Sequence, residues 1–211
     1  MSTPIAVAVS GGIDSLMAAR LLKEQGHPVF GIHFRTRYTG LADIARIGTW
    51  IGMPVHTVDL SREFDRAVVD YFAATYRAGK TPNPCLVCNP AIKFGVLLAH
   101  ARRLGAEALA TGHYARVDIS DSGCRLLQGR DAAKDQSYFL AFLRPDQLRQ
   151  ARFPLGELRK TDVQRMARER GLQPLADSES QDVCFVRGGH YEEFLMQTVG
   201  FRPQPGDIVN P

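Results

Sequence analysis

Cysteine is the residue type with the clearest capacity for chemistry in this 211-residue chain. Cys85 and Cys88 stand three positions apart in TPNPCLVCN, expected to be a loop that two prolines stiffen, and Cys184 lies far downstream in SQDVCFV. A CxxC pair with a distant third cysteine, in a chain whose N-terminus does not resemble a signal peptide, indicates metal, redox or catalytic use rather than a disulfide framework. The local sequence leaves four uses open: a zinc site, a redox pair, iron–sulfur ligands or a nucleophile. Cys124, in a predicted hairpin, is expected to be inert.

A second candidate site is the hexapeptide SGGIDS at residues 10–15, between a predicted strand and a predicted helix. Glycines let the backbone approach a phosphate, and the start of a helix offers unpaired N–H groups and the positive end of its dipole. Asp14 would repel phosphates unless Mg²⁺ lies between them. The loop is neither GxxxxGK[ST], because it has no lysine, nor GxGxxG. It therefore predicts a nucleotide and a divalent metal.

The elements around these sites alternate between apolar strands and amphipathic helices, which predicts an α/β fold with a parallel, doubly wound sheet. The expected strands are 5–10, 28–34, 55–60 and 106–113, and the expected helices are 15–26, 41–53, 62–79 and 91–105. Later segments predict a hairpin around DSG, an extended piece at 180–186, and helices at 134–143, 145–151, 160–171 (with Thr161 as N-cap) and 190–200. We expect an α/β domain over 1–143 and a small, mostly helical region over 144–211.

Composition limits the classes of partner. The net charge of +4 and pI of about 9.0 permit a polyanion without requiring one. Eight Lys or Arg residues face four acids between Arg144 and Arg170, which fits either a solvated helix face or a surface that contacts phosphates. No apolar run approaches the roughly 20 residues that span a membrane, so no membrane contact is expected.

The hexapeptide resembles the pyrophosphate loop (PP-loop) of the N-type ATP pyrophosphatases, whose fold is that of the adenine nucleotide α-hydrolases. Further segments resemble the tRNA-specific 2-thiouridylases, in order along almost the whole chain: TPNPCLVCNPAIKF (81–94), ATGHYARV (110–117), GRDAAKDQSYFL (129–140), FPLGELRKTDV (153–163) and SQDVCFV (180–186). The resemblance implies a cytoplasmic enzyme that adenylates O2 of a wobble uridine (U34) and replaces that oxygen with sulfur. It also implies ATP and Mg²⁺ as cofactors, tRNAs of the Lys, Glu and Gln type as substrates, and a cysteine desulfurase or sulfur-relay protein as donor.

The same resemblance assigns roles to individual residues. Cys184 would receive persulfide sulfur, and Cys88 would release it or pair with Cys184 as a disulfide. The ATP-site positions are Ala8, Val9, Ser10, Gly11, Gly12, Ile13, Asp14, Ser15, Phe34 and Gly112. The positions around the target base are Asn83, Pro84 and Cys85, and those that contact tRNA are Lys134, Asp135 and Gln136. This chemistry calls for a sulfur of low pKa.

Two questions stay open at this level. Cys85 stands where some family members carry Asp, and with Cys88 and Cys184 it could hold a [4Fe–4S] cluster with one open iron. Cluster-free persulfide chemistry and a structural zinc are the alternatives, although the zinc has no evident fourth ligand. Tyr114 and Tyr138 either stack on a splayed base or pack internally.

The chain departs from the family in two places. The segment RTRYTGLADIARIG is short and lacks the family's acidic stretch. The chain also ends at PGDIVNP, where family members continue into a β-rich region, so we expect a short form. The rival hypotheses are a PP-loop enzyme that thiolates another tRNA position and a non-catalytic module that binds tRNA or an adenine nucleotide.

Overall fold

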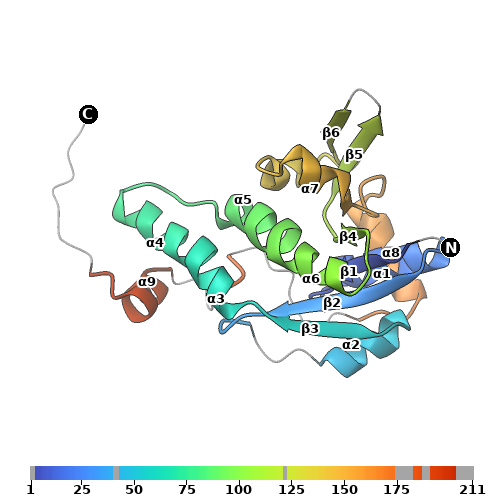
Figure 1. The fold of residues 1–211 in the computed structure, drawn as a ribbon, viewed down its shortest axis with the longest axis horizontal. Coiled ribbons are helices and arrows are strands. Elements are labelled where there is room, and N and C mark those ends of the chain that lie inside the picture. Colours follow the sequence, from blue (N-terminus) through green and yellow to red (C-terminus); the bar gives the residue numbers. More distant parts are fainter. Residues whose placement is uncertain (1–2, 40–42, 121–122, 174–182, 187–190, 203–211) are drawn as a thin grey trace.

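The computed structural model describes residues 3–39, 43–120, 123–173, 183–186 and 191–202 (Figure 1). Its centre is a five-stranded sheet in the order β3-β2-β1-β4-β7, with every neighbouring pair parallel. The strands are β1 (Ile5–Ala8), β2 (Val29–Arg35), β3 (Val55–Asp59), β4 (Ala108–Ala110) and β7 (Ala151–Arg152). The chain runs outward from β1 to β3 and then returns to the other side of β1. Because the order reverses there, the crevice for a ligand is expected at the carboxyl ends of β1 and β4.

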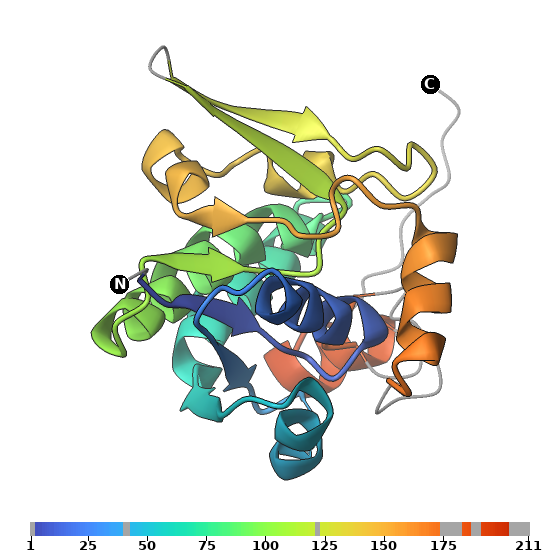
Figure 2. The same cartoon turned by 90° about the vertical axis from the view of Figure 1, so that its right-hand side faces the viewer.

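Helices cover both faces of the sheet, which confirms the doubly wound α/β prediction (Figures 1 and 2). Ile5 and Val7 face one apolar cluster, whereas Ala6 between them faces the other, as the two-residue period of a strand requires. The first cluster is covered by α1 (Ile13–Glu24), α2 (Ile44–Ile51) and α8 (Lys160–Glu169). The second is covered by α3 (Ser61–Phe64), η1 (Asp65–Val69), α4 (Asp70–Arg77), α5 (Pro84–Cys88), η2 (Asn89–Leu97) and α6 (Leu98–Arg103).

The remaining elements lie at the edges of this core. The predicted hairpin is confirmed as the antiparallel pair β5 (Ala115–Ser120) and β6 (Gly123–Gln128). Short helices follow: η3 (Ser137–Leu140), α7 (Pro145–Arg149) and, after α8, α9 (Tyr191–Val199). Helix α9 lies against α4, where the rings of Tyr76 and Tyr191 stack at 4.8 Å. Strand β7 and helix α8 come after position 143, where the sequence places the end of the α/β domain. Because β7 pairs with β4 and α8 packs on α1, residues after 143 also contribute to the central sheet and its helix layer.

Four local predictions are wrong in detail. The CxxC stretch is the start of a helix rather than a loop, because Pro84 occupies a first-turn position where its missing N–H costs nothing. Residues 183–186 form a turn instead of an extended piece, with Val186 N–H donating to Val183 O, and 180–182 lie outside the described residues. Helix α8 begins at Lys160 with Arg159 as its N-cap, so Thr161 is not the cap. The expected helix over 134–143 is reduced to the 3₁₀ turn η3.

The helix that carries the CxxC pair widens into a π-helix at η2. Pro90 has no N–H for an α-helical bond, and the π geometry accommodates it. A Cβ on Gly95 would lie 2.7 Å from Pro90 O, so only glycine fits one turn later. The buried Gln147 side chain donates to Pro90 O at 2.8 Å and to Phe94 O at 3.1 Å, satisfying carbonyls of the widened turn. These contacts fix the helix on which Cys85 and Cys88 lie.

Within the described residues, one helical run is long and apolar enough to cross a membrane: Pro84–Arg103, with a mean hydropathy of 1.3. The expectation that no such segment exists is therefore wrong on length and composition. Its apolar side chains Ile92, Phe94, Leu97 and Leu98 nevertheless lie in the core against the sheet. That burial is the arrangement of a core helix in an α/β fold.

Candidate nucleotide and sulfur site

The loop SGGIDS lies at the carboxyl end of β1, where the strand order reverses. Gly11 has a φ of 86°, which an L side chain rarely adopts. Ser15 Oγ accepts from Ser10 N–H at 3.1 Å and donates to Gly12 O at 2.9 Å, so this hydroxyl holds the loop in shape. Gly12, the N-cap of α1, has no side chain to cap the first N–H groups. This combination suits an anion at the start of α1.

Asp14, in the first turn of α1, is held from two directions. The Lys160 ammonium donates to both carboxylate oxygens at 2.8 Å, and Tyr114 Oη–H donates to Oδ1 at 2.9 Å. Lys160 is 146 positions away in the chain, and its side chain is 8% exposed. Lys160 therefore supplies a counter-charge of the kind that the sequence argument assigns to Mg²⁺, and Asp14 does not by itself require a metal.

The turn after β4 packs directly on the loop. A Cβ on Gly112 would lie 2.7 Å from Asp14 C and 2.9 Å from Ser15 N, both backbone atoms that cannot move aside cheaply. His113, next in the chain, is buried, and its Nδ1 lies 2.6 Å from Thr111 Oγ1. Burial, reinforced by the Lys93 ammonium, holds the pKa of His113 well below its usual range. The imidazole is thus neutral at pH 7, which suits packing beside a nucleotide site.

Two further motif segments reach the same place. Asp131 Oδ2 accepts the backbone N–H of Lys160 at 2.9 Å and so fixes the start of α8. A Cβ on Gly156 would collide with the carbonyl oxygen of Ala115, so FPLGEL passes tightly over the start of β5. Segments 110–117, 129–140 and 153–163 therefore converge on Asp14. Sequence reasoning missed Lys160 and Tyr114 as its partners; the available signal was a lysine in the first turn of a helix, where the dipole disfavours a cation.

The other predicted ATP-site positions lie at the same sheet edge. Ala8 ends β1, and the Val9 carbonyl lies 2.7 Å from Nδ1 of the buried His33. Phe34 is half-buried near the carboxyl end of β2, where its ring packs against the second apolar cluster. Its proposed contact with adenosine stays a prediction.

The region that carries the thiols also lies near the carboxyl ends of the strands. Helix α6 leads into β4, so its N-terminal extension α5 lies near the carboxyl ends of the strands. The pKa of Cys88 is raised to about 12, chiefly by burial; Lys93 lowers it, and the nearby thiols of Cys184 and Cys85 add smaller upward contributions. Neighbouring protein atoms also desolvate the thiols of Cys85 and Cys184 and raise their pKa, although both residues keep solvent-exposed surface, and Lys93 again opposes the shift. Cys88 and Cys184, 96 positions apart, thus lie within electrostatic reach of one another. The expectation of a low-pKa sulfur is not met by any of the three.

The cluster and zinc hypotheses both require the thiols of Cys85, Cys88 and Cys184 to lie close enough together to bind one metal group. Among the residues that the structure describes, no group of three or more His, Cys, Asp or Glu side chains is arranged to hold a metal ion. Cys85, Cys88, Cys124 and Cys184 are all free cysteines. The assignment of Cys85, Cys88 and Cys184 as ligands of a [4Fe–4S] cluster stays a prediction, as does the zinc alternative.

The residues predicted to contact RNA differ in exposure and in their hydrogen bonds within the protein. Asp135 accepts from Gly129 N–H and Ser137 Oγ–H, both at 2.8 Å, and these bonds outweigh burial to hold its pKa below the usual value. Gln136 Oε1 accepts from Tyr114 N–H at 3.1 Å. Lys134 is exposed, as is Tyr138, whereas Tyr114 is buried. Of the two tyrosines, Tyr114 packs internally, and only Tyr138 is open to a stacked base. Asn83 is half-buried and Pro84 is buried beside Cys85.

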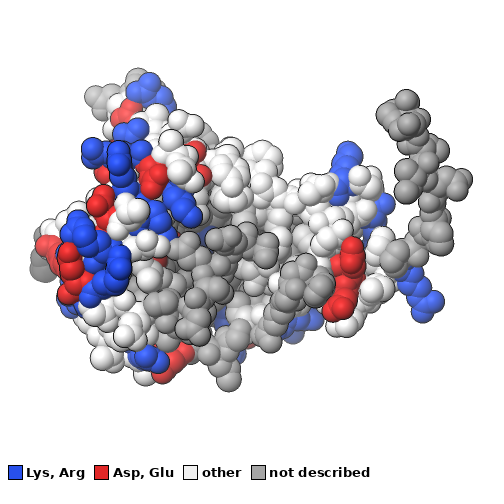
Figure 3. All heavy atoms as spheres, turned by 180° about the vertical axis from the view of Figure 1, so that it is seen from behind, with Lys and Arg blue, Asp and Glu red and all other residues white. Residues whose placement is uncertain are grey.

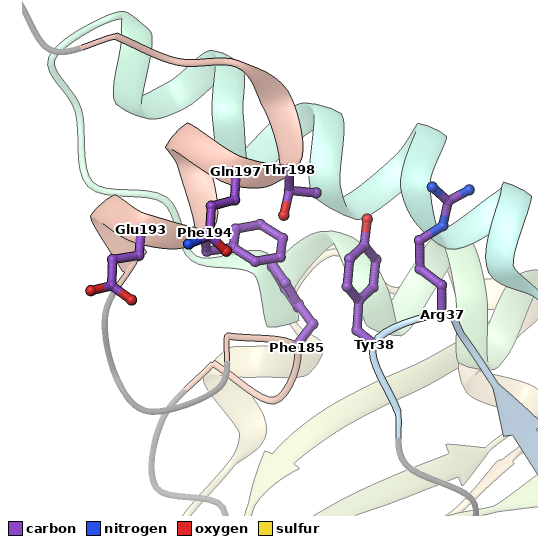
Figure 4. A pocket seen from close by; sticks show the side chains of 7 residues that line it. All are labelled: Arg37, Tyr38, Phe185, Glu193, Phe194, Gln197 and Thr198. Atoms are coloured by element: carbon purple, nitrogen blue, oxygen red, sulfur yellow. The ribbon is translucent and has the colours of Figure 1, made fainter.

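An aromatic cluster anchors the turn that carries Cys184. The Phe185 ring contacts Phe64, Phe72 and Phe194 with centroid separations of 5.4, 5.2 and 5.3 Å. A cavity of about 260 Å³ opens beside it (Figure 4). Its lining residues are Arg37, Tyr38, Phe185, Glu193, Phe194, Gln197 and Thr198. The position of Cys184 thus depends on packing between α9 and the helices on the second face.

Lys and Arg side chains gather at the end of the molecule that carries α8 and the hairpin (Figure 3). Several of them form ion pairs, among them Arg116–Glu157, Arg125–Asp118 and Arg165–Glu169. Acids interspersed in this way reduce the local field, yet the surface stays suited to a polyanion.

A parallel, doubly wound sheet with a glycine-rich loop at its switch point defines an α/β nucleotide-binding domain. Two solved structures share the fold. A 4-thiouridine synthetase–RNA complex with bound ATP matches with a TM-score of 0.52 and 18% identity over 94% of this chain and 50% of that one. NMN synthetase from Francisella tularensis matches with a TM-score of 0.51 and 13% identity over 96% and 79%. At such identities the likeness shows the fold alone.

The chain belongs to the family described as tRNA methyl transferase HUP domain, whose family model matches residues 3–188. Its curated relatives include the tRNA-specific 2-thiouridylase MnmA of Desulfosudis oleivorans, 50% identical over 207 residues, which are 97% of this chain and 58% of the relative. The protein of the same name from Acidithiobacillus ferrooxidans is 44% identical over 212 residues, covering 97% and 60%. The resemblance to the 2-thiouridylases is thereby confirmed. The chain spans about three fifths of the length of these relatives.

Proposed function

We propose that the chain catalyses ATP-dependent replacement of O2 by sulfur in a tRNA uridine, most specifically the wobble uridine U34. The presence of a nucleotide loop and of three cysteines near the carboxyl ends of the strands supports this class of reaction. A uracil carbonyl is a poor electrophile because its oxygen leaves badly, and adenylation of O2 with release of pyrophosphate turns that oxygen into part of a good leaving group. Sulfur then attacks C2 and AMP departs.

The sulfur step needs two thiols. A donor loads Cys184 as a persulfide, and the terminal sulfur attacks C2 of the activated uridine. Cys88 then attacks the remaining S–S bond, which leaves 2-thiouridine and a Cys88–Cys184 disulfide. The transferred sulfur gains two electrons, the two thiols lose two, and a cellular reductant restores them. These steps use the two thiols alone.

The observation that supports this proposal is the electrostatic influence of Lys93 on both regions. Its ammonium lowers the pKa of Cys85, Cys88 and Cys184, and also that of His113, beside the nucleotide loop. This shared influence supports a site in which the thiols and the loop act on one substrate base. The similarity to proteins named 2-thiouridylases supports the same reaction.

The remaining assignments belong to the same proposal. The substrates are tRNAs of the Lys, Glu and Gln type, and the sulfur donor is a cysteine desulfurase or a sulfur-relay protein. ATP would sit on the loop with Mg²⁺ on its phosphates. Lys134 and Tyr138 would face the RNA. Free cysteines fit a cytoplasmic protein, because that compartment keeps thiols reduced.

The test is a product assay. The chain is purified without oxygen and incubated with ATP, a cysteine desulfurase with cysteine as persulfide donor, a thiol reductant and unthiolated tRNA, and the digested tRNA is examined by nucleoside mass spectrometry. We expect 2-thiouridine only with ATP, and its loss in Cys88→Ser and Cys184→Ser. Cys124→Ser is the matched control and should keep full activity.

Two outcomes would overturn the proposal in different ways. A thiolated base other than 2-thiouridine would favour an enzyme for another tRNA position. The absence of both thiolation and tRNA-dependent pyrophosphate release would favour a binding module for tRNA or an adenine nucleotide.

A further inference from the structure

We propose that His33 is a positioning residue of the nucleotide site, whose imidazole keeps the backbone N–H of Phe34 free to donate to the base. The inference rests on the proposed use of ATP and names a residue that prepares the site for adenine. His33 lies on β2, one position before Phe34, and is 7% exposed. Its Nδ1 lies 2.7 Å from the carbonyl oxygen of Val9, the residue that precedes SGGIDS.

The pairing of β1 with β2 shows what this contact replaces. Parallel strands exchange evenly spaced N–H···O bonds, and the last one here runs from Val9 N–H to Ile32 O at 3.0 Å. Continued by one step, the same ladder would have Phe34 N–H donate to Val9 O. That bond is not formed among the residues that the structure describes, and the register ends with Ala8 opposite Ile32. The imidazole of His33 donates to Val9 O instead.

The acceptor fixes which ring nitrogen carries the hydrogen. A carbonyl oxygen can only accept, so Nδ1 of His33 is the donor in this contact. Val9 is buried as well, and a buried carbonyl without a donor is costly. Because the imidazole supplies that donor, the sheet does not need the N–H of Phe34 at this point.

The N–H of Phe34 is directed to the place where a base would lie. Gly31 N–H and Arg35 O bond to residues that flank β3, so the alternate residues Ile32 and Phe34 direct their backbone groups to the β1 side. Beyond the end of β1 that side is the crevice at the switch point of the sheet. Adenine carries an acceptor at N1 beside a donor at N6, which complements an adjacent N–H and C=O. Guanine presents the reverse order, so the free backbone edge of Phe34 favours adenine.

A purely structural role for His33, in which it only satisfies a buried carbonyl, is the competing explanation. Both explanations predict lower stability when the imidazole is removed. Only the positioning role predicts a loss of affinity that depends on the N1 atom of the base. His56, an exposed histidine on the neighbouring strand β3, provides a matched control in the same sheet.

The experiment compares ATP with 1-deaza-ATP, in which a C–H group replaces N1. Equilibrium binding of each is measured for the whole chain and for His33→Phe, His33→Asn and His56→Phe. The wild type should prefer ATP by about 10-fold, the effect of one hydrogen bond. In His33→Phe the N–H of Phe34 is drawn back to Val9 O, so ATP should bind about 10-fold more weakly and 1-deaza-ATP nearly as before. His33→Asn, whose amide can donate in place of Nδ1, should recover most of the ATP affinity, and His56→Phe should match the wild type.

The outcomes separate this inference from the proposed function. Equal losses for ATP and 1-deaza-ATP in His33→Phe would overturn the inference in favour of the structural role, and so would an unchanged preference for ATP. If His33→Phe does not fold, His33→Gln replaces it with the same expectation, because its longer amide reaches the position of Nε2 rather than Nδ1. A wild-type chain that bound neither nucleotide would overturn the proposed use of ATP itself, and this inference with it.

Discussion

The nucleotide loop and the thiol region both lie near the carboxyl ends of the strands, yet the loop holds ionised side chains whereas the thiol region holds uncharged ones. At the loop, Asp14 is paired with Lys160 and Tyr114, and Ser15 is hydrogen-bonded within the turn. In the thiol region, burial raises the pKa of Cys85, Cys88 and Cys184. The loop thus presents organised charge, whereas the thiols are held in their uncharged form.

This difference separates two requirements of the proposed reaction. Binding a polyphosphate benefits from charges that are in place beforehand, since no reorganisation is then needed. A sulfur carrier instead benefits from staying protonated between turnovers, because the thiolate is the form that oxidants attack. Lys93 lowers the pKa of all three thiols against the larger effect of burial, which indicates where activation would begin.

The largest expected effect tests whether burial keeps Cys88 in its thiol form, and it is seen in the reactivity of that residue. Its pKa of about 12, against 9.0 for an ordinary thiol, predicts roughly 1,000-fold less thiolate at pH 8. In a variant with Cys85, Cys124 and Cys184 replaced by Ser, we expect iodoacetamide to alkylate native Cys88 at least that much more slowly than the urea-unfolded chain. Near-equal rates would show that Cys88 is not held as a thiol.

The same shift links stability to pH. The folded state keeps a proton on Cys88 that the unfolded chain releases above about pH 9, so this contribution to stability is complete below pH 9 and lost as pH rises toward 12. The stability of the wild type should fall more steeply than that of Cys88→Ala, by up to about 1.4 kcal/mol per pH unit. Urea titrations at pH 8, 9 and 10 measure the difference. Parallel slopes would contradict it.

The nucleotide side is challenged most directly by Gly112→Ala. The added methyl would lie 2.7 Å from Asp14 C, so the backbone of the loop must move. A displacement of about 1 Å in such a site can cost on the order of 100-fold, and we expect that loss in ATP affinity. Gly79→Ala is the control for backbone strain without a close contact, because Gly79 has a φ of 69° and a Cβ there meets nothing within 4 Å; it should lower stability and leave ATP affinity unchanged. Unchanged ATP binding in Gly112→Ala would show that the close approach is not needed.

Much of this arrangement could be predicted from the sequence, and the reasons are local. The strands and helices around SGGIDS follow from apolar periodicity, and the hexapeptide itself marks the switch point. The hairpin follows from the turn DSG between two alternating segments, and the structure has it as β5 and β6. In each case neighbouring residues carry the whole signal.

The parts that sequence reasoning missed depend on contacts between distant residues. The Asp14–Lys160 pair joins positions 146 apart, and no local pattern announces it. The raised thiol pKa values follow from burial against elements that the motif does not contain. The CxxC stretch was expected to be a loop because prolines break helices, but Pro84 lies in the first turn, and a π-helix accommodates Pro90.

The smallest expected effect comes from replacing Lys93, whose charge shifts pKa values both in the thiol region and beside the nucleotide loop. Removal of its ammonium in Lys93→Met should raise the pKa of Cys85 and Cys184 further, because Lys93 lowers both. Alkylation of these exposed residues at pH 8 should slow several-fold. In Lys93→Arg the charge remains, so the rates should stay near those of the wild type, and the exposed Lys80→Met tests for a general loss of charge.

The same variant should raise the pKa of His113, since Lys93 also lowers that value. The two shifts share a sign because a cation disfavours the protonated form of both group types: it stabilises a thiolate and opposes an imidazolium. NMR titration of His113 and alkylation of Cys184 in one sample would therefore report on both regions together. A change in only one of them would show that Lys93 belongs to that region alone, and the electrostatic connection between loop and thiols would have to be abandoned.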